Sequence, residues 1–208
     1  PPGIAPYVSH GFRLALEKAP ARKAASVSSS DTASASDSNA TPLLRECAQR
    51  TDFEATGCFG ALDIPRYRVT DYAPAAFHFI RTRSGITRKK HLLSLSRLTG
   101  GGKGAGKSGQ LFFQSHDGAY VLKTIKPSEL PVLLEILPSY AAFLARHPCS
   151  LLPRFFGLAS FTLPKKHGGA VVLVIMENVL RPKPLGKSGW FTRRPARRQR
   201  IHEVYDLK

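Results

Sequence analysis

The sequence is poor in cysteine and in long apolar runs, and each shortage excludes a class of protein. Three cysteines occur among 208 residues, with no Cys-x-x-Cys pair, which argues against a disulfide framework and against a zinc site. The longest apolar run covers residues 170–176, far short of the ~20 residues that a membrane-spanning helix needs. The cysteine usage leads us to expect a reducing compartment. The chain starts at Pro1 instead of methionine and has no leader-like segment, so we expect it to be a piece of a longer product.

Acidic residues are also scarce: 14 Asp and Glu face 31 Lys and Arg, which gives a formal charge of +17. Residues 1–60 carry six residues of each sign, so the whole excess follows residue 60. Residues 181–208 alone hold nine basic and two acidic residues. A segment this basic favours polyanions, and charge alone leaves open nucleic acid, an anionic membrane, a phosphorylated substrate or a solvated loop without a partner.

The first 60 residues offer little for a packed core. Residues 24–40 contain seven serines and five alanines among 17 residues and no aromatic side chain, which is typical of a disordered linker. We therefore expect residues 1–60 to be a low-complexity, disordered and largely irregular region. Residues 61–208 are expected to form the folded domain.

The folded part is predicted to open with two helices. Residues 74–83 fit a helix that Asp71 caps and Gly85 stops, and residues 88–98 fit a second helix that ends within residues 99–102.

Beyond residue 109, strands surround one long helix. Two β-rich runs flank the turn at Asp117 and Gly118, which predicts a hairpin. A helix over residues 127–146 comes next, and residues 155–161 and 170–176 fit two further strands. The expected fold is α+β: a small antiparallel sheet with the long helix on one face and the two earlier helices flanking it.

The glycine-rich segment, residues 101–109, satisfies two phosphate-binding patterns. Residues 101–108 fit the P-loop pattern GxxxxGK[ST], and residues 104–109 fit the GxGxxG pattern of dinucleotide sites and kinase loops. A P-loop or a dinucleotide loop must open a helix, whereas residues 111–113 continue as a strand. What remains is a loop between antiparallel strands that covers a nucleotide with backbone amides, with a plain flexible loop as the alternative.

A nucleotide loop of this kind requires a lysine on the next strand. Lys123 lies there and shares its strand face with apolar side chains, although a surface lysine is the alternative. Glu129 and Glu135 on the following helix are the candidates for its acidic partner. Residues 176–179, at the end of the last strand, are expected to form a connector whose backbone contacts an adenine. This order of parts is that of the small lobe of a kinase.

Seven stretches resemble sequence motifs of one family: DYAPAAF (71–77), GKSG (106–109), FFQSHDGAYVLKTI (112–125), SELPVLLEILPSY (128–140), LLPRFFGL (151–158), VIMENVL (174–180) and IHEVYDLK (201–208). Together they resemble the phosphatidylinositol phosphate kinases, in particular the 4-phosphate 5-kinases. The resemblance covers roughly residues 63–208 and implies the N-terminal, ATP-binding lobe of a lipid kinase, truncated before the large lobe.

The resemblance implies transfer of the ATP γ-phosphoryl group to a phosphatidylinositol monophosphate, most often from the 4-phosphate to the 4,5-bisphosphate, with ATP and Mg²⁺ as cofactors. Lys123 matches the lysine that contacts ATP phosphates, and Lys208 matches the lysine of the family's DLKGS motif. The catalytic and magnesium-binding aspartates belong to the large lobe, so no metal ligand is predicted here. The predicted site residues are Lys123 and Lys208 for catalysis, and Gly106, Lys107, Ser108, Gly109, Lys123, Glu129, Asn178 and Val179 for nucleotide binding.

The resemblance also implies a partner and a location: a phosphoinositide substrate in an anionic membrane, and a peripheral position on the cytosolic face. Nucleic acid is not expected, because no nucleic-acid-binding pattern is present. Residues 186–199 look like an insertion, and the candidates for membrane contact are Arg193, Arg194, Arg197, Arg198 and Arg200. The alternative is a non-catalytic basic module that binds anionic membrane or nucleic acid.

Overall fold

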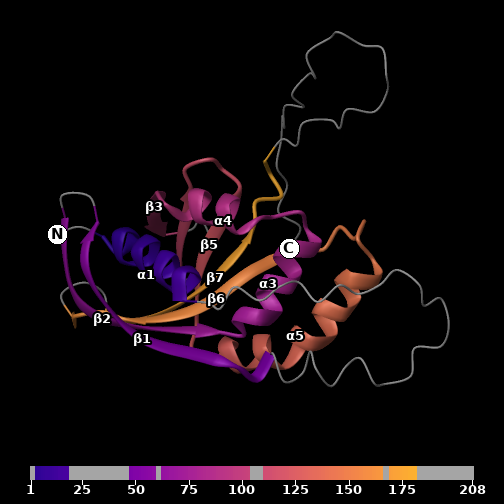
Figure 1. The fold of residues 1–208 in the computed structure, drawn as a ribbon, viewed down its shortest axis with the longest axis horizontal. Helices are drawn as coiled ribbons and strands as arrows, with labels where there is room; N and C mark the ends of the chain where they lie inside the picture. Colours follow the sequence, from indigo (N-terminus) through magenta and orange to yellow (C-terminus); the bar gives the residue numbers. More distant parts are fainter. Residues whose placement is uncertain (1–2, 19–46, 60–61, 104–109, 166–168, 182–208) are drawn as a thin grey trace, which may run out of the picture.

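The computed structural model describes residues 3–18, 47–59, 62–103, 110–165 and 169–181. One antiparallel sheet of seven strands, in the order β1-β2-β6-β7-β5-β4-β3, runs through this part of the chain, with helices on both faces (Figure 1). The expected α+β fold is confirmed. The elements are α1 (Ala5–Lys18), β1 (Arg50–Phe59), β2 (Leu62–Tyr72), α3 (Pro74–Arg83), α4 (Arg88–Leu95), β3 (Leu98–Lys103), β4 (Leu111–Ser115), β5 (Tyr120–Ile125), α5 (Glu129–Arg146), β6 (Phe155–Thr162) and β7 (Ala170–Glu177).

Helix α5 covers one face of the sheet. Its buried residues are Leu137, Ala141 and Leu144, and Leu137 lies with Leu158 of β6 and Val174 of β7 around a small apolar cavity. Leu158 and Val174 are register partners, so they share this face. The predicted long helix and the strands it covers are therefore confirmed.

Helix α1 packs on the opposite face. The Phe12 ring meets Phe161 of β6 edge-on, with 5.3 Å between ring centroids, and strand alternation places Phe161 on the face away from Leu158. The helix comes this close because Gly11 has no side chain: a Cβ there would lie 2.5 Å from the Phe161 ring. The expectation of an irregular region over residues 1–60 is thus wrong for α1 and β1, which both contribute to the common core.

Helix α3 begins differently from the prediction. Its N-cap is Ala73, at φ 47°, followed by Pro74 at the first helical position. Asp71 is not the cap, because it belongs to β2 and pairs in register with Ala159.

Helix α4 is shorter than predicted. It ends at Leu95, and residues 98–103 form β3 instead of continuing the helix and its terminator. Gly100 and Gly101, at φ +96° and +97°, lie at a bulge in the pairing of β3 with β4. Only glycine adopts such a backbone readily, so here the glycines bend a strand instead of ending a helix.

Candidate nucleotide-binding site

The glycine-rich segment connects two adjacent antiparallel strands. Leu98 of β3 pairs with Ser115 of β4, and Lys103 pairs with Leu111 on either side of residues 104–109. This arrangement excludes a P-loop, which would run from a strand into a helix N-terminus. The predicted loop residues Gly106, Lys107, Ser108 and Gly109, like Lys208, lie outside the described residues, so their roles stay predictions.

Lys123 lies on an interior strand of the sheet, β5, between β4 and β7. Phe112, Lys123 and Val174 are consecutive register partners across these three strands, which places them on the α5 side of the sheet. The Lys123 ammonium lies 5.8 Å from the centroid of the Phe112 ring. Its side chain is half-buried, so the charge is held against an apolar surface instead of projecting into water.

The acidic partner proposed for Lys123 is not in place. Glu129 Oε2 accepts hydrogen bonds from the Lys126 backbone N–H at 2.6 Å and from Gln110 Nε2 at 3.4 Å. Glu129 therefore holds the start of α5 and the residue that follows the glycine-rich segment. In the described ranges, no carboxylate of Glu129, Glu135 or any other residue lies within 4.0 Å of Lys123 Nζ.

The connector after β7 is anchored on the β4–β5 turn. The Asn178 backbone N–H donates to Ala119 O at 3.0 Å, and Asn178 Nδ2 donates to Gly118 O at 2.9 Å. The backbone N–H and one side-chain N–H of Asn178 are thus occupied within the chain. Val179, which is 56% exposed, remains accessible to a ligand.

One continuous surface joins Lys123 to this connector. Val121 pairs with Met176, and both lie on the same sheet face as Lys123 and Phe112. A single ammonium beside apolar side chains and an exposed connector residue suits a ligand with phosphates at one end and a flat apolar ring at the other. Sequence alternation correctly predicted that Lys123 shares its strand face with apolar side chains of β5.

A buried polar cluster lies on the other face of the sheet, and the sequence reasoning missed it. It consists of the buried residues Arg81 of α3, His91 of α4 and Tyr120 of β5, together with the half-buried Asp71 of β2. His91 Nδ1 and the Tyr120 hydroxyl are 3.1 Å apart. A signal was present: Arg81 follows Phe77 by four residues, as a core residue of the helix would.

Burial governs the pKa values of this cluster. It raises the pKa of Asp71 to about 7, against the opposing effect of the Arg81 guanidinium. It also holds the pKa of His91 well below its usual range, so the imidazole is neutral near pH 7.

The raised pKa of Asp71 predicts a pH-dependent stability. Between about pH 4 and 7 the folded chain keeps a proton that the unfolded chain releases, so ionisation of Asp71 weakens folding as the pH rises through this window. Relative to Asp71→Asn, which cannot titrate here, we expect the parent to lose on the order of 1 kcal/mol or more of unfolding free energy from pH 4 to 7. Urea denaturation of both proteins at several pH values measures this difference, and a constant difference would contradict it.

Comparison with known proteins identifies the family of this chain. Residues 96–208 match the family described as Phosphatidylinositol-4-phosphate 5-Kinase. The chain is 36% identical over 167 residues to a probable phosphatidylinositol phosphate kinase of Dictyostelium discoideum, covering 77% of this chain and 21% of that protein.

Two further relatives carry the same kind of name. Phosphatidylinositol 4-phosphate 5-kinase 7 of Arabidopsis thaliana is 34% identical, covering 66% of this chain and 16% of its own length. Phosphatidylinositol 4-phosphate 5-kinase type-1 beta of Mus musculus is 33% identical, covering 69% and 24%. The chain thus spans about a fifth of the length of these relatives. It belongs to the phosphatidylinositol-4-phosphate 5-kinase family.

Proposed function

We propose that this chain is the ATP-binding lobe of a lipid kinase that phosphorylates phosphatidylinositol 4-phosphate to the 4,5-bisphosphate. The observation that carries the proposal is the position of Lys123: the ammonium lies on the sheet face that extends from the end of the glycine-rich segment to the connector. The names of the relatives support the choice of substrate.

Each part of this surface has a distinct task in the proposal. ATP supplies the phosphoryl group, and Lys123 stabilises charge on its phosphates. Val121 and Met176 pack against the base, and the exposed Val179 backbone bonds to its edge. We include Mg²⁺ because ATP phosphates carry it in kinases. We assign it no ligand, since the described segments contain no group of three His, Cys, Asp or Glu side chains suited to a metal.

Phosphate transfer from labelled ATP tests this function directly. The full-length protein is incubated with vesicles that contain phosphatidylinositol 4-phosphate or, as a control, phosphatidylinositol 5-phosphate, and the labelled lipids are separated. We expect label in the bisphosphate from the 4-phosphate. If only phosphatidylinositol 5-phosphate became labelled, the proposed position of phosphorylation on the inositol ring would be wrong. If neither lipid became labelled, the proposed phosphoryl transfer itself would be wrong.

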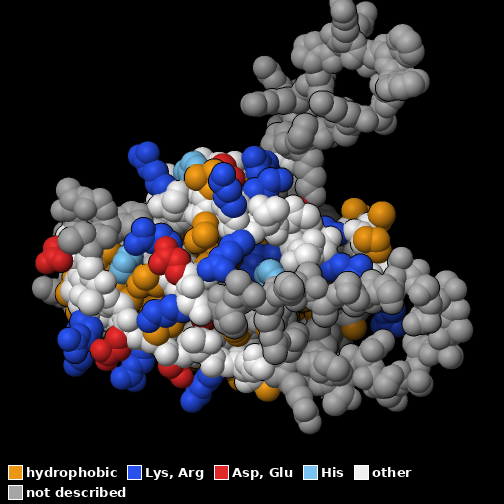
Figure 2. Space-filling model, viewed as in Figure 1, with side chains coloured by type: hydrophobic (Ala, Val, Ile, Leu, Met, Phe, Trp, Pro, Cys, Tyr) orange, Lys and Arg blue, Asp and Glu red, His pale blue; other side chains and the backbone are white. Residues whose placement is uncertain are grey.

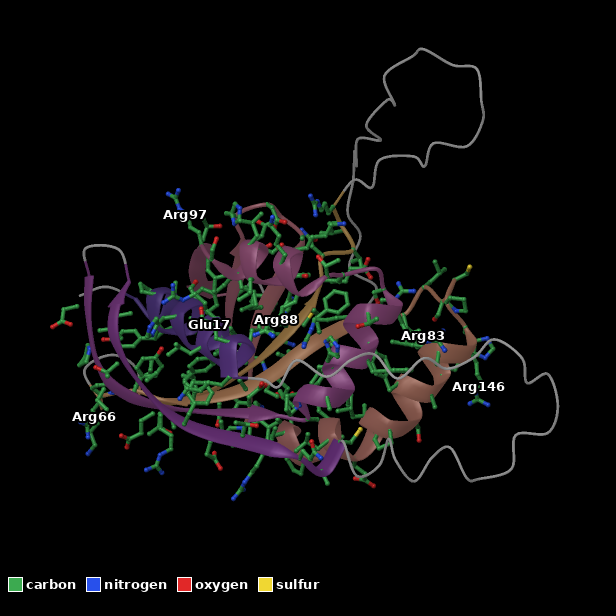
Figure 3. The ribbon with its side chains drawn as sticks, in the orientation of Figure 1. Glu17, Arg66, Arg83, Arg88, Arg97 and Arg146 are labelled. Carbon is green, nitrogen blue, oxygen red and sulfur yellow. The ribbon has the colours of Figure 1, made fainter. Side chains whose placement is uncertain are left out.

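We further propose that the protein acts at an anionic membrane. Basic side chains outnumber acidic ones over the face in Figure 2, and Arg66, Arg97 and Arg146 project from the fold in Figure 3. None of the helices in the described ranges has the length and hydropathy that a membrane crossing needs. We propose that the attachment is electrostatic, with about 1 kcal/mol contributed by each basic residue near an anionic leaflet.

Vesicle co-sedimentation at low and moderate salt tests this attachment. Arg193, Arg194, Arg197, Arg198 and Arg200, which lie outside the described residues, are replaced together by Gln. We expect both the replacement and the added salt to weaken binding of the full-length protein to anionic vesicles, because screening shortens the reach of each charge. Binding that ignored both changes would contradict an electrostatic attachment.

A further inference from the structure

Helix α3 takes the place of a strand beside one end of β6. Strand β2 pairs with β6 only over residues 159–162, and α3 packs along the rest of β6 (Figure 1). A buried strand edge leaves backbone carbonyls that need a donor. Arg81, which is only 8% exposed, supplies one: its Nη1 donates to the carbonyl oxygen of Phe156.

Phe156 occupies a special place in the ladder. It is the extra residue at a bulge, because Phe155 pairs with Met176 and Gly157 pairs with Ile175. These partners are among the last residues of β7, next to the connector. Arg81 therefore binds β6 at the bulge that pairs with the end of β7, just before the connector.

The same cluster also contacts the start of β5, next to the β4–β5 turn that binds Asn178. Tyr120 packs on the Phe156 ring, with 5.4 Å between centroids, and its hydroxyl contacts His91. Tyr120 opens β5, directly after the Gly118 and Ala119 carbonyls that hold Asn178. Arg81 and its neighbours thus contact both structures that hold the connector: the β6 bulge that pairs with the end of β7, and the residue that follows the β4–β5 turn.

A buried guanidinium is costly unless it has a task that an apolar side chain cannot perform. Its N–H donors form a rigid planar fork, a geometry that neither lysine nor methionine reproduces. We propose that Arg81 is a positioning residue for the nucleotide base: it places the connector, and so Val179, at the distance that the base requires. The inference rests on the proposed function, since it concerns the same site.

This role predicts different effects on binding of the base and on binding of the phosphates. The phosphates are assigned to the glycine-rich segment and to Lys123, which lies on the opposite face of β5 from Tyr120, the member of the Arg81 cluster on that strand. Displacement of the connector should therefore weaken recognition of the base and leave recognition of the phosphates unchanged. A role in stability alone would weaken both ends together or neither.

Calorimetric titration of the full chain with ATP and, separately, with inorganic tripolyphosphate tests the separation. For Arg81→Met we expect the Kd for ATP to rise about tenfold or more, because small misplacements of binding groups are costly. The Kd for tripolyphosphate should stay within about twofold of the parental value. The matched control is Arg83→Met on the same helix, whose side chain is exposed over Phe79 (Figure 3) and should change neither constant.

Arg81→Lys serves where the methionine variant does not fold, since it keeps the charge and loses the planar fork. It should raise the Kd for ATP by a smaller factor and leave the Kd for tripolyphosphate unchanged. Thermal denaturation confirms that the sample is folded. Equal weakening of ATP and tripolyphosphate, or unchanged ATP binding, would overturn the role of Arg81. A parental chain that bound neither ligand would overturn the proposed function itself.

Discussion

Replacement of Lys123 by alanine is expected to reduce phosphoryl transfer by the full-length protein about 100-fold or more, while the fold stays intact. The side chain sits on a central strand against Phe112, and its ammonium has no carboxylate partner in the described ranges whose loss would destabilise the sheet. Its charge is therefore available to phosphates. Lys123→Arg should rescue little, because a planar guanidinium does not replace a compact ammonium at the same reach.

Steady-state rates with varied ATP, together with circular dichroism, measure this effect. The matched control is Lys126→Ala, three residues further on, where the exposed side chain lies past the end of β5. We expect the control to keep parental activity. Parental turnover by the Lys123 variant would show that β5 does not present the phosphate-binding lysine.

Phe12→Ala is expected to destabilise the folded lobe by about 3–5 kcal/mol, the usual cost of removing a buried phenylalanine. Phe12 is 3% exposed and packs on Phe161 of the central sheet. An effect of this size would show that α1 is part of the core, although it is far in sequence from β6. Chemical denaturation of the two proteins measures the difference.

The neighbouring Arg13→Ala is the control for this helix. Arg13 points to solvent and forms an exposed pair with Glu17 at 3.8 Å, a contact that contributes little. We expect a change within about 0.5 kcal/mol. Equal, small effects for both variants would mean that α1 does not pack on the sheet as described.

Sequence reasoning located the elements whose ends carry strong local signals. The Asp117-Gly118 turn marks the β4–β5 hairpin, and the sequence His147-Pro148 marks the end of α5. It missed α1, β1, β2 and β3. In β1 and β2 charged residues alternate with Phe53, Tyr67 and other core residues, so their mean hydropathy conceals the strands.

Helix α1 was missed for a different reason. Its buried residues Tyr7, Val8, Phe12 and Ala15 follow a helical period, but the serine-rich segment after them dominates the composition of residues 1–60. A shorter window over the first 20 residues would have found it.

The site was predictable only in part. Strand alternation gives the face of Lys123, since its period of two is independent of distant contacts. Two other contacts depend on tertiary placement: Glu129 accepts from Gln110, 19 residues away, and Arg81 donates to a carbonyl 75 residues away. Local sequence carries no signal for contacts of that kind.

The central claim is that the Lys123 face binds the phosphates of ATP. An acyl phosphate of ATP acylates lysine amines that lie against the triphosphate, and mass spectrometry of the treated chain locates the modified residues. The account predicts modification of Lys123, with or without Lys107, that excess ATP prevents. ATP-protected modification confined to lysines of α4, such as Lys89 or Lys90, or no ATP-protected lysine at all, would contradict it.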